Sequence, residues 1–198
     1  MVFGHQPAAV TVLEGIKAKL PDADVTYAPG PEIKRDIPSW FESGMGGRKK
    51  KPVQTPEEAE VAYQKAIETA RDADIVTMVL GETNFMSGEA ASRASLDLPG
   101  RQEEMLKEIA AMGKPIVLVL LNGRPLSINW ADGNIPAILE AWQPGTEGGH
   151  AVADILFGDY NPGGKLPVCF PQKGSHAPLY YGRNLTHSPE GSRMYNPR

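Results

Sequence analysis

Two continuous apolar runs constrain the fold of this 198-residue chain more than any other feature: residues 75–80 and 116–121. Apart from Thr77 the first run is apolar and largely β-branched, and the second is apolar throughout, as in strands buried on both faces. Residues 101–112 lie between them with helical apolar spacing and end at Gly113, a typical left-handed helix terminator. A strand, helix and strand in this order predict a parallel pair joined by a right-handed crossover.

The rest of the chain extends this pattern. Helices are predicted at residues 8–20, at 55–71 with Thr55 as N-cap, near 128–130, and after Thr146 and Glu147. Further short strands are predicted at residues 25–28, 137–141 and 166–170. We therefore expect one α/β domain over residues 1–198, a three-layer sandwich with a mostly parallel sheet of about five strands and helices on both faces. Residues 29–53 are expected to form a long irregular loop, and residues 172–198 a surface tail.

Composition excludes several functions. The net charge is −4 and no basic stripe is present, which argues against nucleic acid as a partner. No apolar stretch is long enough to cross a membrane, and the N-terminus lacks a signal-peptide pattern. Cys169 is the single cysteine, so the chain forms no internal disulfide. The histidines lack the spacing of metal ligands, and neither a metal nor a cofactor is expected.

The loop after the first apolar run carries the candidate chemistry. Glu82 and Glu89 are separated by apolar residues that include Phe85, and Arg93 follows four residues after Glu89. An apolar neighbour raises a carboxyl pKa towards the value that a general acid needs, whereas a nearby arginine lowers it. The alternative is structural: Glu82 caps a backbone turn, and Glu89 forms an ion pair with Arg93 one helical turn away.

Several blocks together resemble glycoside hydrolase family 3, and in particular the α/β sandwich that follows the catalytic barrel in its periplasmic β-glucosidase branch. These blocks are VLGETNFMSGEAASR, SLDLPGRQEEML, GKPIVLVLLNGRPL and ILEAWQPGTEGGHAVADILFGDYNPGGKLPVCFP, with the looser TVLEGIKAKL and PLYYGR. They recur in order and cover most of the chain.

The resemblance implies a retaining, exo-acting β-glucosidase that acts on a β-linked oligosaccharide or glucoside. In such enzymes two carboxyl groups lie about 5 Å apart, one as nucleophile and the other as general acid/base. The family places the nucleophile on the barrel and the acid/base glutamate on a loop of this domain. Its pattern of a glutamate, an arginine four residues later and a Leu-x-Leu-Pro block assigns Glu89 as the acid/base.

The same resemblance gives the neighbouring residues supporting roles. Glu82 is expected to position the loop or the sugar. Arg93 either orients Glu89 or forms a plain surface ion pair. Phe85 and Met86 either form an apolar wall for the sugar or anchor the loop. These alternatives remain open from the sequence.

Relative to the family pattern, the barrel, the first strand of the sandwich and the following fibronectin-like domain are absent. We therefore expect a fragment of a larger periplasmic or secreted enzyme, inactive without its barrel. One competing hypothesis is a non-catalytic carbohydrate-binding or scaffold module of the same fold. Another is a flavodoxin-like nucleotide binder, which the absence of a glycine-rich phosphate loop after a strand disfavours.

Overall fold

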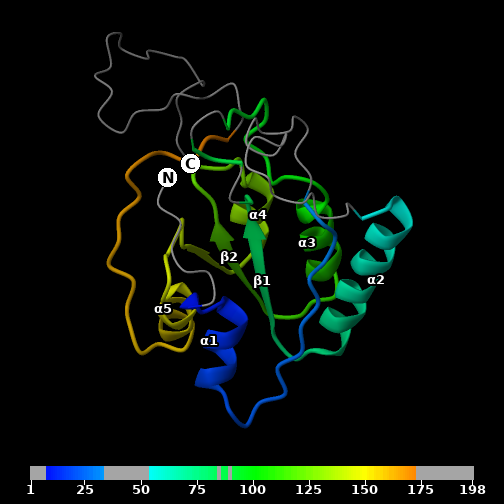
Figure 1. Cartoon of the computed structure of the whole chain (residues 1–198), viewed down its shortest axis with the longest axis vertical. Coiled ribbons are helices and arrows are strands. Elements are labelled where there is room, and N and C mark those ends of the chain that lie inside the picture. The colour runs from blue at the N-terminus through cyan, green and yellow to red at the C-terminus, as the bar shows by residue number, and fades with distance from the viewer. Residues whose placement is uncertain (1–7, 34–53, 84–85, 89–90, 173–198) are drawn as a thin grey trace.

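The computed structural model describes residues 8–33, 54–83, 86–88 and 91–172. Its centre is a parallel sheet of three strands in the order β1-β2-β3, shown in Figure 1. The strands are β1 (Val76–Gly81), β2 (Ile116–Leu121) and β3 (Ala137–Glu140). Val76 pairs with Ile116, and Leu120 pairs with Glu140, so all three strands end at the same edge of the sheet.

Helices precede, connect or follow these strands. They are α1 (Val12–Lys19), α2 (Pro56–Asp72), α3 (Gln102–Ala110), α4 (Asn129–Asn134) and α5 (Gly148–Leu156). Helix α2 begins as predicted, because the side chain of Thr55 accepts a hydrogen bond from the Glu58 N–H and the Glu58 carboxylate accepts one from the Thr55 N–H. Gly113 adopts a φ of +73° beyond the end of α3, in line with its predicted role as a terminator.

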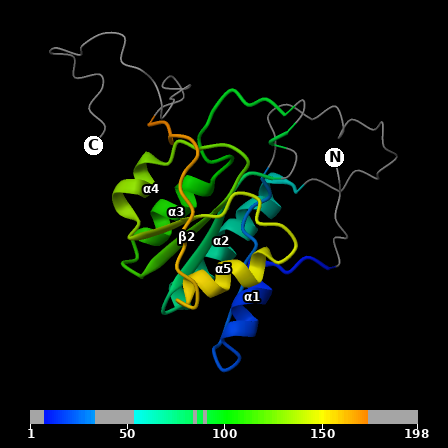
Figure 2. The same cartoon turned by 90° about the vertical axis from the view of Figure 1, so that its left-hand side faces the viewer.

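The helices cover both faces of the sheet, as expected for a three-layer α/β sandwich (Figures 1 and 2). Helices α2, α3 and α4 pack on the face that carries Met78, Leu80, Leu118 and Leu120, and this is the larger core. Helices α1 and α5 pack on the other face, where Val12, Val119 and Val152 form a smaller core. The predicted fold class is therefore confirmed.

The sheet is smaller than predicted. In the described part of the chain it has three strands rather than about five, because residues 25–28 and 166–170 form no strand. The first apolar run is also not buried on both faces: Val79 is 41% exposed and Ile75 is 64% exposed. The smaller core is centred on Val119 of β2, so α1 and α5 leave Val79 of β1 partly open.

One residue of α2 does not lie where its apolar character suggests. The apolar residues of α2 suggest that Val61 is buried, but it is 69% exposed. Tyr63 lies on the buried face instead, since it shares the helical spacing of Ala66, Ile67 and Ala70. Its hydroxyl donates a hydrogen bond to Glu108 at 2.8 Å, which satisfies the polar end of an otherwise buried ring.

The predicted irregular loop and tail lie largely outside the described residues. Residues 34–53 of the loop and residues 173–198 of the tail belong to this part. Their assignment stays a prediction.

Candidate functional site at the carboxyl edge of the sheet

The carboxyl ends of β1 and β2 are held together by a close backbone contact. Gly81, the last residue of β1, has a φ of +138°, and a Cβ there would lie 2.0 Å from the Leu121 carbonyl oxygen. The N–H of Glu82 then donates to that carbonyl at 2.9 Å. Only glycine fits this position. The close contact places Glu82 directly beside the end of β2.

The Glu82 carboxylate is buried between two arginines. Its side chain is 1% exposed, and its Oε1 lies 2.8 Å from Arg93 Nη1 and 3.0 Å from Arg124 Nε. Its Oε2 accepts a hydrogen bond from the Gly123 N–H at 3.2 Å. A buried carboxylate needs such partners, since an unpaired charge in this position is costly. We refer to Glu82, Arg93 and Arg124 as the Glu82 cluster.

Arg93 connects this cluster to the end of the loop. Its Nη1 pairs with Glu82, its Nη2 donates to the Asp97 carbonyl at 2.8 Å, and its side chain is 14% exposed. The structure thus places Arg93 against Glu82 in a buried ion pair. Glu89 lies outside the described residues, so neither the Glu89–Arg93 pair nor the orienting role is tested.

Arg124 was missed by the sequence reasoning. It follows β2, and its Nη2 donates to the Ala91 carbonyl at 2.9 Å and to the Met86 carbonyl. The available signal was its position: a cation just after one strand, at the edge where a glutamate follows the neighbouring strand, is placed to pair with that glutamate.

Further contacts fix the two loops. The Ser87 hydroxyl accepts a hydrogen bond from Gln143 Nε2 at 3.3 Å, and a Cβ at Gly123 would lie 2.2 Å from that hydroxyl oxygen. The carboxamide of Gln102 accepts from the Gly81 N–H at 2.7 Å and donates to the Gly81 carbonyl at 2.8 Å. Gln102 therefore satisfies the free backbone edge of β1 at the point where the loop begins.

Of the predicted site residues, the structure brings Glu82 and Arg93 together, while Phe85 and Glu89 lie outside the described residues. Met86, which was predicted to lie beside the sugar or to anchor the loop, is 2% exposed. Its burial makes it an anchor for the backbone that precedes position 89 in the sequence.

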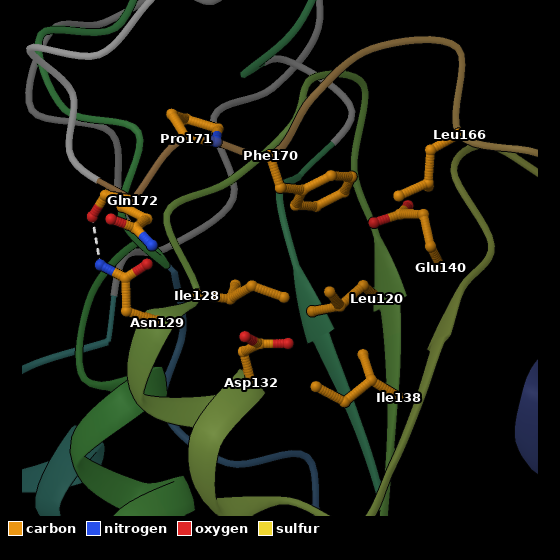
Figure 3. A pocket seen from close by; sticks show the side chains of 10 residues that line it. All are labelled: Leu120, Ile128, Asn129, Asp132, Ile138, Glu140, Leu166, Phe170, Pro171 and Gln172. Carbon is orange, nitrogen blue, oxygen red and sulfur yellow. Dashed lines mark hydrogen bonds between the residues drawn. The ribbon is translucent and has the colours of Figure 1, made fainter. Parts of the chain in front are cut away.

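A pocket of about 720 Å³ lies close to this edge, between α4, the ends of β2 and β3, and residues 166–172 (Figure 3). Its walls combine apolar side chains with two carboxylates, Asp132 and Glu140. Figure 3 shows the Phe170 ring above Leu120, near the Glu140 carboxylate. The lining residues are Leu120, Ile128, Asn129, Asp132, Ile138, Glu140, Leu166, Phe170, Pro171 and Gln172.

Glu140 links the pocket to the Glu82 cluster. Its Oε2 accepts from Asn122 Nδ2 at 3.3 Å, and the same amide nitrogen donates to the Arg124 carbonyl at 2.8 Å. Burial raises the pKa of Glu140, while the hydrogen bonds from the Trp142 N–H and from Asn122 oppose the rise. Trp142 has a φ of +50°, an uncommon conformation for a bulky residue, and its ring lies 5.8 Å from that of Phe170.

Other kinds of site find little support. Within the described ranges, no group of three or more histidine, cysteine or acidic residues is arranged to hold a metal ion. No helix in those ranges has the length and apolar character needed to span a bilayer. His150 lies on the exposed surface of α5 beside Glu147.

The chain is similar to known glycosidases over most of its length. Residues 2–197 match the family model described as the glycosyl hydrolase family 3 C-terminal domain. A periplasmic β-glucosidase of Salmonella typhimurium is 40% identical over 190 residues, which is 96% of this chain and 24% of that protein. A β-xylosidase of Formosa agariphila is 40% identical over 179 residues, which is 90% of this chain and 22% of that protein.

Solved structures give the same result. A β-glucosidase from Listeria innocua in complex with isofagomine has a TM-score of 0.75 and 30% identity, with 97% of this chain and 24% of that chain covered. A β-glucosidase from Erythrobacter marinus has a TM-score of 0.74 and 35% identity, with 87% and 24% covered. The chain thus spans about a quarter of the length of the relatives that it matches.

Proposed function

This chain belongs to the glycosyl hydrolase family 3 C-terminal domain family, and from that premise we propose that it is the second domain of a retaining, exo-acting β-glucosidase. In this proposal Glu89 is the general acid/base, and the nucleophilic aspartate is supplied by a barrel domain outside the chain. The substrate is a terminal β-D-glucosyl residue of an oligosaccharide or glucoside. A periplasmic or secreted location of the whole enzyme is part of the proposal, supported by the name of the Salmonella relative.

The observation that carries the proposal is the Glu82 cluster. It ties Glu82 and Arg93 to Arg124 in the loop after β2, at the edge where all three parallel strands end. Ligands of open parallel sheets bind beyond this edge. A loop fixed in this way can present an acid to a reacting group held by another domain.

The chemistry follows from the two-carboxyl mechanism of retaining glycosidases. Glu89, protonated, would donate its proton to the glycosidic oxygen while the nucleophile attacks the anomeric carbon. The same carboxylate would then remove a proton from water, which displaces the nucleophile and releases the sugar with its configuration retained. Because the nucleophile lies on the barrel, the 198-residue chain by itself should not turn over an aryl β-glucoside.

The assignment is tested in the enzyme that contains this chain. Glu89→Ala should nearly abolish hydrolysis of substrates with poor leaving groups, because general acid catalysis contributes roughly 10²–10⁴-fold. Azide should restore turnover of activated aryl glucosides as a β-glucosyl azide, since a small anion can occupy the space of the missing carboxylate. Glu103→Ala, an exposed glutamate of α3 paired with Lys107, is the matched control and should leave the rates unchanged.

The opposite pattern would overturn the assignment. If Glu89→Ala hydrolysed all substrates normally while Glu82→Ala lost activity and responded to azide, Glu82 would be the acid/base.

A second candidate, a carbohydrate-binding module of the same fold, is favoured by the pocket beside α4. Carboxylates such as Asp132 and Glu140 accept hydrogen bonds from sugar hydroxyls, and the Phe170 ring offers an apolar face to a sugar ring. Under this candidate, cellobiose titrated into the 198-residue chain should shift the NMR resonances of Ile128 and Ile138. Asp132→Asn should weaken the binding, and Asp72→Asn on α2 should not. No shift at millimolar cellobiose would contradict it.

A further inference from the structure

We propose that Arg124 is a positioning residue for the reaction, which holds the backbone on both sides of the acid/base in one place. The inference rests on the proposed function of Glu89. Arg124 contributes no proton and no bond to the substrate in this account. It acts on the loop, through three contacts that a single guanidinium group makes at once.

The contacts connect three separate parts of the molecule. Nη2 donates to the carbonyls of Met86 and Ala91, and Nε lies 3.0 Å from the Glu82 carboxylate. Met86 lies three residues before Glu89 in the sequence and Ala91 two residues after it, so the two carbonyls flank the proposed acid/base, one on each side. The guanidinium thus fastens the chain before and after the proposed acid and ties both points to the end of β1.

The anchor itself is well supported. The Arg124 side chain is 22% exposed, and its own carbonyl accepts a hydrogen bond from the Asn122 amide, which is in turn bound to Glu140 on β3. The planar, always charged guanidinium is suited to several fixed acceptors. A lysine has one compact charge and cannot reproduce this geometry.

The anchor matters because acid catalysis depends on distance. Two residues of extended chain span at most about 7 Å, so a fixed carbonyl at Ala91 restricts the region that position 89 can reach. A misplacement of a reacting group by about 1 Å costs up to roughly 10²-fold in rate. Loss of the Arg124 contacts should therefore reduce proton donation while leaving the nucleophile of the barrel unaffected.

The test compares Arg124→Lys and Arg124→Ala in the enzyme that contains this chain. Both should lower kcat/KM for substrates with poor leaving groups by roughly 10–100-fold and spare activated aryl glucosides. Millimolar guanidinium should partly restore Arg124→Ala. Arg101→Ala is the matched control: this exposed arginine pairs with Glu60 and Glu104 on the surface and should show neither effect.

A second readout needs no activity. In the 198-residue chain, hydrogen exchange of peptides covering residues 83–93 should accelerate in both Arg124 variants, with the exchange of α2 unchanged. Arg124→Lys keeps a positive charge beside the buried Glu82 carboxylate. The hydrogen-exchange test can therefore be made with this variant if Arg124→Ala does not fold.

The outcomes separate this inference from the proposed function. Suppose that the loss of kcat/KM in Glu89→Ala depends on the leaving group. If the Arg124 variants then slow all substrates equally, or slow none of them, Arg124 is not a positioning residue. Unchanged exchange in residues 83–93 would contradict it as well. If the kcat/KM of Glu89→Ala shows no dependence on the leaving group, the proposed role of Glu89 is wrong. The hydrogen-exchange experiment still shows whether Arg124 holds the loop.

Discussion

At the scale of single residues, burial sets the protonation of Glu140. Its half-buried carboxyl group faces apolar residues of the pocket, and in the described part of the chain it accepts hydrogen bonds from the uncharged Asn122 side chain and the Trp142 N–H. Loss of solvation is the largest effect, so the pKa of Glu140 is raised above its ordinary value of 4.5. The folded state then binds this proton more tightly than the unfolded state does.

This raised pKa predicts a pH-dependent stability. The contribution of Glu140 is fully present below pH 4.5 and is lost as the pH rises through the raised pKa of the folded state. The glutamine side chain of Glu140→Gln cannot ionise, so this variant does not lose stability in the same way as the pH rises. Urea unfolding between pH 4 and pH 7 should show the free energy of unfolding of the variant improving relative to the parent as the pH rises.

The control has the opposite sign. The hydrogen bond from Arg101 lowers the pKa of Glu104, so its contribution is present above pH 4.5 and lost as the pH falls. The free energy of unfolding of Glu104→Gln should therefore decrease relative to that of the parent as the pH rises. If the difference between Glu140→Gln and the parent did not change with pH, the burial of Glu140 would not set its charge.

The candidate site was only partly predictable from sequence at this scale. Glu82 was predicted to position the loop or the sugar, since it comes directly after a strand. The structure pairs its carboxylate with Arg93 and Arg124, and its role in the reaction stays a prediction. Its ion pair with Arg93 was not predicted, because the i,i+4 spacing indicated Glu89 as the partner of Arg93. Arg124 lies 42 positions beyond Glu82 in the sequence numbering, and such long-range pairing depends on strand register, which no local pattern contains.

At the scale of elements, α1 and α5 approach so closely that their glycines touch. A Cβ at Gly15 would lie 2.1 Å from the Gly149 carbonyl oxygen, and a Cβ at Gly149 would lie 2.1 Å from the Thr11 carbonyl oxygen. The Gly149 N–H donates to the Val10 carbonyl at 3.0 Å, and Lys19 pairs with Asp154 at 2.5 Å. The layer of α1 and α5 thus depends on backbone contact.

Gly15→Ala should therefore destabilise the chain, although alanine is the better helix former. The added methyl group meets backbone atoms that cannot rotate away, and overpacking of this kind costs about 1–3 kcal/mol. Chemical denaturation gives the free energy of unfolding directly. Gly133→Ala in α4 is the control, since a Cβ there meets nothing within 4 Å and should be neutral or stabilising by up to about 1 kcal/mol. Equal effects at both glycines would contradict the close packing of α1 on α5.

The positions of most elements follow from local signals. Thr55 and Glu58 form the predicted N-cap of α2, and the apolar runs at β1 and β2 became strands. Residues 25–28 and 166–170 carry similar apolar signals but form no strand. A strand needs a partner as well as a pattern, and the presence of that partner is decided by the tertiary fold.

At the scale of the whole molecule, the described sheet has β1 and β3 as its edges, and both loops of the Glu82 cluster meet at its carboxyl end. The chain spans about a quarter of the length of its relatives. Our proposal divides the two carboxyl groups of the reaction between domains. In it the sandwich would supply the proton donor, and the barrel would supply the nucleophile and most of the sugar pocket.

The central claim is that the loop after β1 protonates the leaving group. The most direct measurement is kcat/KM for a series of aryl β-glucosides of rising leaving-group pKa, with the parent enzyme and with Glu89→Ala. We predict a shallow dependence on leaving-group pKa for the parent and a steep one for Glu89→Ala, because the variant must expel an unprotonated leaving group. Parallel dependences for the two proteins would contradict the account.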